Sequence, residues 1–98
     1  MRPDAVFVRR LGVMGCELQL HADEPRISIP AYESTTVDTA GVGDTHIATM
    51  CAALLLGHDF VEAARMANAA AAITISHESA LPVPSWEQIR EVMKNGRV

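Results

Sequence analysis

The sequence predicts an α/β fold in which three short strands are followed by a glycine loop and three helices. Three observations carry this prediction. Apolar and polar residues alternate in short runs through the first thirty positions, which is typical of half-buried strands. Two glycines then stand one residue apart, in Gly41-Val42-Gly43, directly before a long apolar run. Two further helical segments follow, and each is introduced by a capping pattern.

Length and composition limit the class of protein. The chain has 98 residues, of which 49% are hydrophobic and 4% aromatic, so it is one domain or part of one, with an aliphatic core. A net charge of −4 without a basic run argues against a nucleic-acid partner. The sequence shows no signal peptide and no membrane-length apolar run, which predicts a cytoplasmic protein without membrane contact. Cys16 and Cys51 should then be reduced, and we expect Cys51 to be buried in a helix.

The strands are expected between residues 5 and 30. A strand is expected over residues 6–10, because residues 5–8 are apolar and β-branched, while residues 16–20 and 26–30 alternate between apolar and polar. Turns should join these strands, the first around the glycines of residues 11–15. The basic pair Arg9-Arg10 is interpreted as a solvated strand end.

The first helix is expected from about residue 43 to 56, with a glycine directly after it. It is apolar nearly all round, which predicts a helix buried on every side. The second helix begins at a capping-box-like pair, Asp59 and Glu62, and the third begins at a similar pair, Ser85 and Gln88.

The loop at residues 38–44, Asp-Thr-Ala-Gly-Val-Gly-Asp, is the candidate site. Glycines at the start of a helix let the backbone approach a ligand closely, and the first-turn amides and the helix dipole favour an anion. Gly41, Val42, Gly43 and Asp44 are therefore predicted to bind phosphate. A carboxylate repels phosphate unless it has a chemical task, so Asp44 is interpreted as the base that takes a proton from an attacking hydroxyl. The alternative is that Asp44 only caps the helix.

Among the other polar residues, His46 and Asn68 matter most. None of the four histidines has the spacing of a metal pair. His46 lies about 200° around the helix from Asp44, so we expect it to face a wall of the site. Asn68 interrupts an alanine-rich helix, where it is either an exposed position or part of a flat wall against a purine. The sequence has no Walker-type motif, so it is not a P-loop protein.

Together these segments resemble the ribokinase-like (PfkB-type) family of carbohydrate kinases. Residues 38–44 resemble its C-terminal signature, Leu11-Gly12-x-x-Gly15 resembles the glycine turn before it, and residues 57–72 resemble its next helix pair. The resemblance implies a three-layer αβα fold. Residues 1–98 would form a single partial domain, the C-terminal portion of such a kinase, with the anion-hole loop before helices that fill residues 44–94.

The resemblance also implies an activity: ATP-dependent phosphoryl transfer to a hydroxyl of a sugar or sugar-like substrate. Asp44 would be the base, and the amides of residues 41–44 would form the anion hole. Gly12, Gly15 and Asn68 would border the nucleotide.

A monovalent cation, K⁺, is implied as well, held by Asp38 and the carbonyl of Ala40. The sequence departs from the family pattern at three positions near the site: Val42 stands in place of alanine, His46 in place of an aromatic residue, and Ser79 in place of a glycine near the cation loop.

The family's Asn-x-x-Glu motif, which organises Mg²⁺, does not occur in the sequence. We therefore expect the magnesium ligands to lie largely outside this chain, and the chain alone to be inactive. Its partners would be ATP, a sugar-like molecule, and either a second copy in a homo-oligomer or a complement that supplies the missing N-terminal half. The alternative function is a truncated, non-catalytic module that binds nucleotide or a partner chain.

Overall fold

The structure, a computed structural model, describes residues 6–10, 15–39, 41–77 and 84–98. Three strands precede three helices: β1 (Phe7–Arg10), β2 (Cys16–Gln19), β3 (Ile27–Ile29), α1 (Val42–Leu55), α2 (Phe60–Ile75) and α3 (Trp86–Asn95). This order confirms the predicted succession of elements. The prediction for the turn at residues 11–14 lies outside the described residues.

The strands form an antiparallel sheet in the order β1-β2-β3. Arg10 is the partner of Cys16, and Val8 is the partner of Leu18. Cys16 and Leu18 have no exposed surface, so their face of the sheet is the one that packs against the helices. The alternation expected from the sequence therefore predicts correctly which face of the sheet points towards the core.

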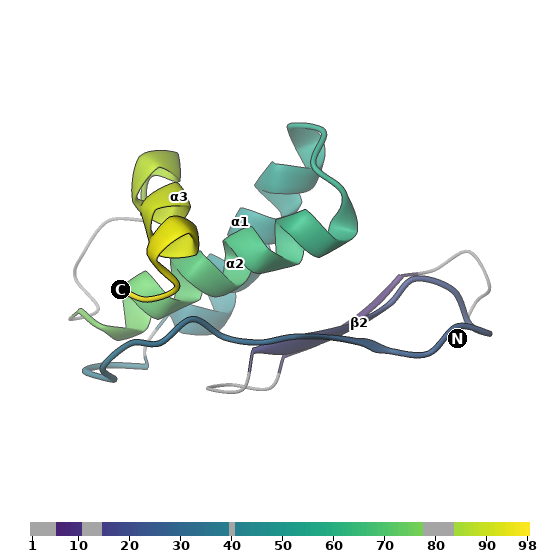
Figure 1. Cartoon of the computed structure of the whole chain (residues 1–98), viewed down its shortest axis with the longest axis horizontal. Helices are drawn as coiled ribbons and strands as arrows, with labels where there is room; N and C mark the ends of the chain where they lie inside the picture. Colours follow the sequence, from purple (N-terminus) through teal and green to yellow (C-terminus); the bar gives the residue numbers. More distant parts are fainter. Residues whose placement is uncertain (1–5, 11–14, 40, 78–83) are drawn as a thin grey trace.

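Helix α2 lies at the centre of the helical layer. It packs against β2 and β3 on one side and contacts α1 and α3 on others, and Figure 1 shows all three helices on the same side of the strand layer. Alanine suits a helix in this central position, because its small side chain lets neighbouring backbones approach closely. The alanines of α2 that have no exposed surface are Ala63, Ala64, Ala67, Ala69 and Ala70.

Helix α1 is only half covered, so the expectation of a helix buried on every side is wrong. Its buried residues are His46, Thr49, Met50 and Ala53. In contrast, Ile47 is 50% exposed, Leu55 is 88% exposed, and Cys51 is exposed although we expected it to be buried. The physical reason is that α2 covers one stripe of α1, while no other element of the described chain packs against the opposite stripe.

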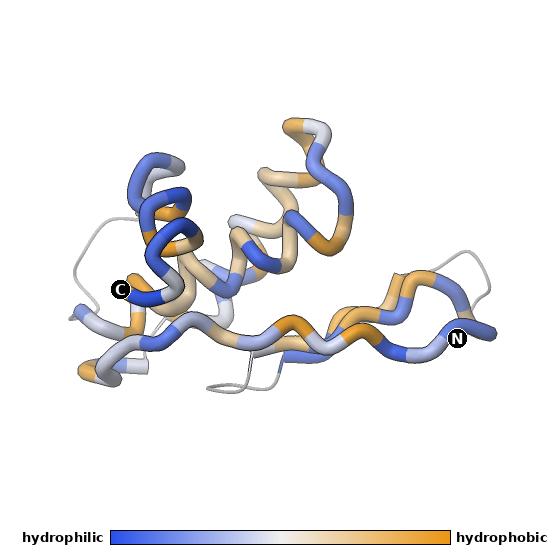
Figure 2. Tube along the Cα trace, viewed as in Figure 1, coloured by the Kyte–Doolittle hydropathy of each residue, from blue (hydrophilic) through white to orange (hydrophobic). Residues whose placement is uncertain are grey.

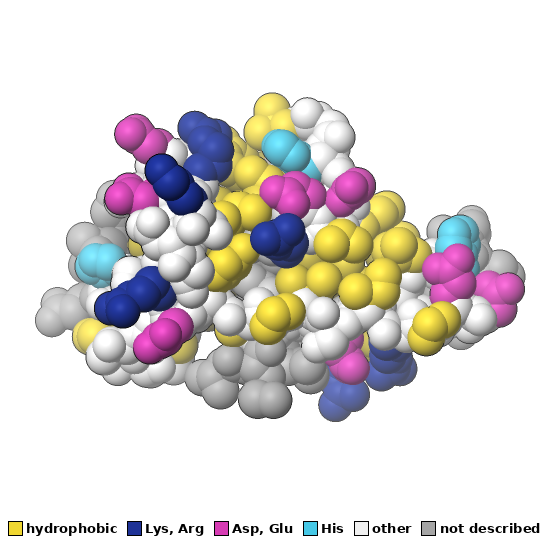
Figure 3. All heavy atoms as spheres, in the orientation of Figure 1, with side chains coloured by type: hydrophobic (Ala, Val, Ile, Leu, Met, Phe, Trp, Pro, Cys, Tyr) yellow, Lys and Arg dark blue, Asp and Glu magenta, His cyan; other side chains and the backbone are white. Residues whose placement is uncertain are grey.

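The remaining surface mixes apolar and charged side chains. Figure 2 shows hydrophobic positions both in the helices and along the strand layer, and Figure 3 shows hydrophobic side chains gathered over both on the face viewed. In the described part of the chain, no helix combines the length and the hydrophobicity that crossing a bilayer requires.

Candidate functional site

A cavity of about 680 Å³ lies where β1, the start of α1 and the C-terminal half of α2 meet. It collects four of the residues that the sequence predicted for the site: Gly15, Val42, Gly43 and Asn68. Arg10 and His46 also line it. Three further predicted residues are close in sequence to lining residues but do not line the cavity themselves: Gly41, Asp44 and Asp38. Gly12 and Ala40, also predicted for the site, fall outside the described residues.

Helix α1 starts without a side-chain cap. Its N-cap is Gly41, with φ of 76° and ψ of −2°, a left-handed conformation that glycine adopts at no steric cost. The first intrahelical bond runs from the amide of Thr45 to the Gly41 carbonyl, at 2.9 Å. In contrast, α2 and α3 begin at Asp59 and Ser85, whose side chains accept backbone amides. No side chain therefore caps the amides of residues 42–44, although the Val42 amide donates to the Thr39 carbonyl at 3.4 Å.

Asp44 does not cap α1. It stands three residues after the N-cap, in the first turn, and its side chain is exposed to solvent. The alternative interpretation, in which Asp44 serves as the helix cap, therefore does not agree with the structure. A carboxylate beside uncapped amides is available for chemistry with a bound anion.

The two arginines at the end of β1 have different surroundings. Arg9 lies 3.9 Å from Glu17 in an exposed ion pair, which fits the interpretation of a solvated strand end. Arg10 instead donates a hydrogen bond from Nη1 to the Gly43 carbonyl, at 2.7 Å. Both arginines line the cavity. The sequence analysis missed Arg10, although the strand alternation that placed Cys16 and Leu18 in the core also separates Arg10 from Arg9.

His46 and Asn68 form a buried contact at the back of the cavity. His46 Nε2 lies 2.9 Å from Asn68 Oδ1, and Asn68 Nδ2 donates to the carbonyls of Ile29 and Pro30 at 3.0 and 3.2 Å. The interpretation of Asn68 as an exposed helix position is therefore wrong, since only 3% of it is exposed. Its two amide hydrogens are used by the backbone, so its oxygen is the acceptor and His46 Nε2 carries the hydrogen.

Burial lowers the pKa of His46 below its ordinary value of 6.5, because the charged imidazolium would lose its hydration. The hydrogen bond with Asn68 raises this pKa and the positive charge of Arg10 lowers it, but desolvation has the largest effect. His46 is therefore neutral at pH 7. Because the amide hydrogens of Asn68 are used within the protein, Asn68 would contact a bound nucleotide only as part of the cavity wall and not as a hydrogen-bond donor.

Both the backbone conformation and the close packing at residue 15 require glycine. Its φ is +98°, and a Cβ there would lie 2.2 Å from the Ile29 carbonyl oxygen and 2.6 Å from the Ala31 nitrogen. Since these are backbone atoms, they cannot move aside cheaply. Gly15 thus lets the chain after the glycine turn lie directly against the end of β3, where Asn68 is also bound.

The predicted cation site is described only in part. The backbone amides of Val37 and Asp38 donate to the Ile75 carbonyl at 2.7 and 3.2 Å, which ties the start of the glycine loop to the end of α2. Ala40 and Ser79 lie outside the described residues. Within the described ranges, no three His, Cys, Asp or Glu side chains lie close enough together to hold a metal ion.

Comparison with protein families gives a match over most of the sequence. The profile of the pfkB family carbohydrate kinases matches residues 3–87. Over 67 residues the chain is 40% identical to the bifunctional protein HldE of Bradyrhizobium sp. (strain ORS 278), an alignment that covers 68% of this chain and 14% of that protein.

Solved structures show the same arrangement of elements. Arabidopsis thaliana ribokinase, in complex with ribose and ATP, matches with a TM-score of 0.80 and 29% identity, covering 89% of this chain and 28% of that one. An E. coli protein described as ribokinase II, in complex with ATP and Mg²⁺, matches with a TM-score of 0.84 and 22% identity, covering 92% of this chain and 29% of that one. The second match shows the fold alone. The chain thus spans less than a third of these relatives.

Proposed function

The chain belongs to the pfkB family of carbohydrate kinases, and we propose that it forms the phosphate-binding and catalytic-base part of an ATP-dependent phosphoryl transfer to a sugar or sugar-like hydroxyl. One observation carries the proposal. A helix begins at a glycine, without a side-chain cap, and holds an exposed Asp44 in its first turn next to a cavity of about 680 Å³. The ribokinase of similar fold was solved with ribose and ATP, which supports the two substrate classes.

The backbone amides of residues 41–44 would bind the transferred phosphoryl group. Phosphoryl transfer depends on positioning and on electrostatic stabilisation of charge on the equatorial oxygens. Amides held at a helix start meet both needs, because they are fixed by the fold and lie at the positive end of the helix dipole. The hydrogen bond between Thr45 and Gly41 keeps this turn in shape.

Asp44 would act as the general base. As the acceptor oxygen bonds to the γ-phosphorus, the hydroxyl proton passes to the Asp44 carboxylate, and the bond to ADP breaks with its electrons remaining on ADP. Its exposed position in the first turn leaves it accessible to such a hydroxyl. Mg²⁺ accompanies ATP in one solved structure of similar fold, but the described residues offer no cluster of ligands for it.

The test is Asp44→Asn. In a polypeptide that contains these 98 residues and turns over, we expect the rate to fall about 10²- to 10⁴-fold, the usual contribution of a positioned general base. ATP affinity should hold or improve, because a negative charge leaves the phosphate site. ATP binding to the 98-residue chain is measured by titration calorimetry, in potassium and in tetramethylammonium chloride. A loss of affinity in the organic cation would support a K⁺ site at Asp38.

Asp59→Asn is the matched control. Asp59 also stands at the start of a helix, and asparagine preserves its capping oxygen, so neither the rate nor ATP affinity should change. If Asp44→Asn keeps the wild-type rate, Asp44 is not the base. If the wild-type chain binds no ATP, the proposed function itself fails.

A second role, binding a partner chain, is favoured by the exposed stripe of α1. Ile47, Leu55 and Leu56 are 50%, 88% and 65% exposed, which is unusual for large apolar side chains on a helix. We propose that the 98-residue chain reaches an active arrangement only when this stripe is covered, by a second copy or by a chain that carries the sugar pocket.

A further inference from the structure

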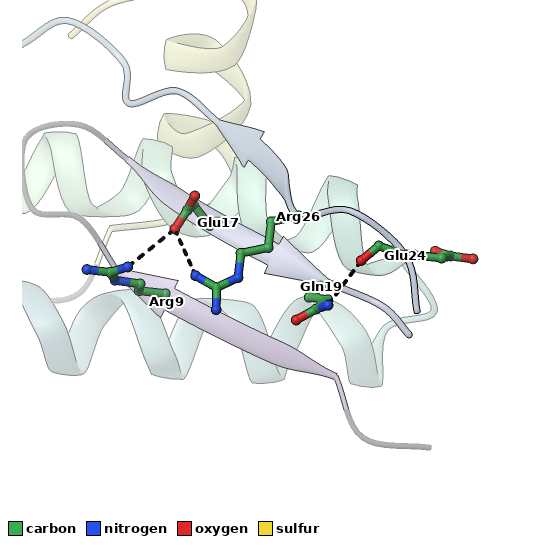
Figure 4. A network of polar contacts seen from close by, with 5 residues as sticks. All are labelled: Arg9, Glu17, Gln19, Glu24 and Arg26. Atoms are coloured by element: carbon green, nitrogen blue, oxygen red, sulfur yellow. Dashed lines mark hydrogen bonds and ion pairs between the residues drawn. The ribbon is translucent and has the colours of Figure 1, made fainter. Parts of the chain in front are cut away.

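The sheet separates the charged residues of β1 onto two faces. Arg9 pairs across the strands with Glu17, and Arg10 with Cys16. Side chains of directly paired residues share a face of the sheet. Figure 4 shows Arg9 and Arg26 reaching Glu17 together on one face, at 3.9 and 3.8 Å. Arg10 therefore belongs to the opposite face, that of the buried Cys16, where its exposed side chain lines the cavity and contacts the start of α1.

The position of Arg10 opposes the usual electrostatics of a helix. Its guanidinium donates to the Gly43 carbonyl at 2.7 Å, in the first turn of α1. Cations are normally stabilised at the C-terminus of a helix, and acids at the N-terminus. Within the described ranges, no carboxylate forms an ion pair with Arg10, whereas Arg9, Arg26 and Arg65 each have one. A guanidinium and a helix N-terminus thus place two sources of positive potential on one cavity.

The described residues use only part of the donors of Arg10. A guanidinium carries five N–H groups in a planar fork, and the contact with Gly43 uses one of them. The remaining groups can bind two oxygens of one phosphate side by side, which a lysine cannot do. His46, which also lines the cavity, is neutral and so does not repel Arg10 from this position.

We propose that Arg10 is a nucleotide-phosphate-binding residue, which holds the phosphate chain across the cavity from the amides of residues 41–44. The inference rests on the proposed function, since it assumes a nucleoside triphosphate in this site. Arg10 binds one phosphate while the amides bind the terminal one, so the chain is gripped at two points and the terminal phosphorus is oriented towards Asp44. The contact with Gly43 fixes the guanidinium before the ligand arrives.

A purely structural role is the competing explanation, because the hydrogen bond from Arg10 to Gly43 also joins β1 to α1. The two roles differ in what they affect. A tether would influence stability and the binding of every ligand, whereas a phosphate ligand influences only those ligands that carry phosphate. The probes are therefore ATP, inorganic tripolyphosphate and adenosine.

The experiment measures the affinity of the 98-residue chain for each probe by titration calorimetry. Arg10→Gln, which keeps an amide donor for the Gly43 carbonyl, should weaken ATP and tripolyphosphate about 10-fold and leave adenosine unchanged. Arg10→Lys keeps the charge but loses the fork, so its loss should be smaller. Arg26→Gln is the matched control, because Arg26 pairs with Glu17 on the other face and does not line the cavity; it should leave all three affinities unchanged.

Each outcome decides the inference. If the wild-type chain binds ATP and tripolyphosphate and Arg10→Gln binds both equally well, Arg10 is not a phosphate ligand, and the proposed function survives. If Arg10→Gln weakens adenosine as much as ATP, or lowers the thermal midpoint together with all three affinities, its role is structural. If the wild-type chain binds no polyphosphate, both the inference and the proposed function are overturned.

Discussion

Single contacts hold the walls of the cavity together. The pair of His46 and Asn68 joins α1 to α2, and Asn68 continues the connection to the carbonyls of Ile29 and Pro30 at the end of β3. All of these partners are buried or lie close to buried atoms. A buried amide that loses its partner costs about 1–3 kcal/mol, so this chain of hydrogen bonds fixes the relative positions of three elements.

The neutral state of His46 predicts how stability depends on pH. The pKa of His46 is lowered in the folded chain, so the unfolded chain binds a proton more readily. This contribution to the free energy of unfolding is fully present above pH 6.5, the ordinary pKa, and is lost as pH falls from 6.5 towards the folded pKa. His46→Gln, which keeps a donor for Asn68 but does not titrate, should lose less stability over that range. Urea unfolding at a series of pH values measures the difference.

The control for this prediction is His58→Gln, because His58 is exposed in the turn between α1 and α2. It should follow the wild-type pH dependence. If His46→Gln also follows the wild-type curve, then burial of a neutral imidazole does not contribute to the pH dependence of folding.

At the residue scale, several positions that the sequence predicted for the site lie close together in the structure. Gly15, Val42, Gly43 and Asn68 were predicted for one site, and the structure gathers them around one cavity. The partners of Asn68 could not be predicted, because Ile29 lies 39 residues away along the chain and contributes only its backbone. Backbone carbonyls carry no sequence signal.

Gly15, directly before β2, lies so close to the backbone after β3 that a Cβ would not fit there. Gly15 and Gly57 share nearly the same φ, +98° and +96°, but only Gly15 has backbone atoms where a Cβ would be. Substituting alanine should therefore cost more at Gly15. We expect about 1–2 kcal/mol of unfolding free energy at Gly57, from the left-handed conformation alone, and a further 1–3 kcal/mol or so at Gly15, from overpacking.

Denaturant unfolding of Gly15→Ala and Gly57→Ala measures both costs, and a Gly15→Ala chain that fails to fold agrees with the prediction. Equal midpoints for the two variants would contradict it, since the open surroundings of Gly57 would then be as restrictive as the backbone contact at Gly15.

At the element scale, local signals predicted helix ends well. The caps at Asp59 and Ser85 and the glycine after α1 act over three or four residues. Both bounds of α1 and the starts of α2 and α3 lie within about two residues of the prediction. The burial of α1 was predicted wrongly, because an apolar composition indicates that a helix can be covered but not which neighbours are present to cover it.

Considered as a whole, the described chain has one helical layer over one small sheet, with α2 in the middle. The sequence favoured a partial ribokinase-like fold, and the similarity to solved kinases confirms it. What remains uncovered is the outer stripe of α1, where Ile47, Cys51 and Leu55 face solvent. Contiguous exposed apolar surface on a small protein marks a place where another surface binds.

We therefore predict that the 98-residue chain self-associates through α1 and is not a working kinase by itself. Burying large apolar side chains contributes about 25 cal/mol per Å² removed from water, and Ile47 and Leu55 are the largest exposed contributors on this helix. The double variant Ile47→Gln, Leu55→Gln should shift the chain towards its monomer mass of 10.6 kDa in light scattering over a concentration series.

The control for association is Val98→Gln, which removes an exposed apolar side chain at the C-terminus, where the Val98 amide donates to the Glu33 carbonyl. This variant should associate like the wild type. The same samples are assayed for phosphotransfer from ATP to a panel of sugars. Without a surface that places the acceptor, a phosphate loop forfeits most of the rate that positioning supplies, about 7–11 kcal/mol of the barrier. A monodisperse wild-type monomer that phosphorylates a sugar at an ordinary enzymatic rate would refute both halves of the prediction, because neither a covered α1 stripe nor a second chain would then be required.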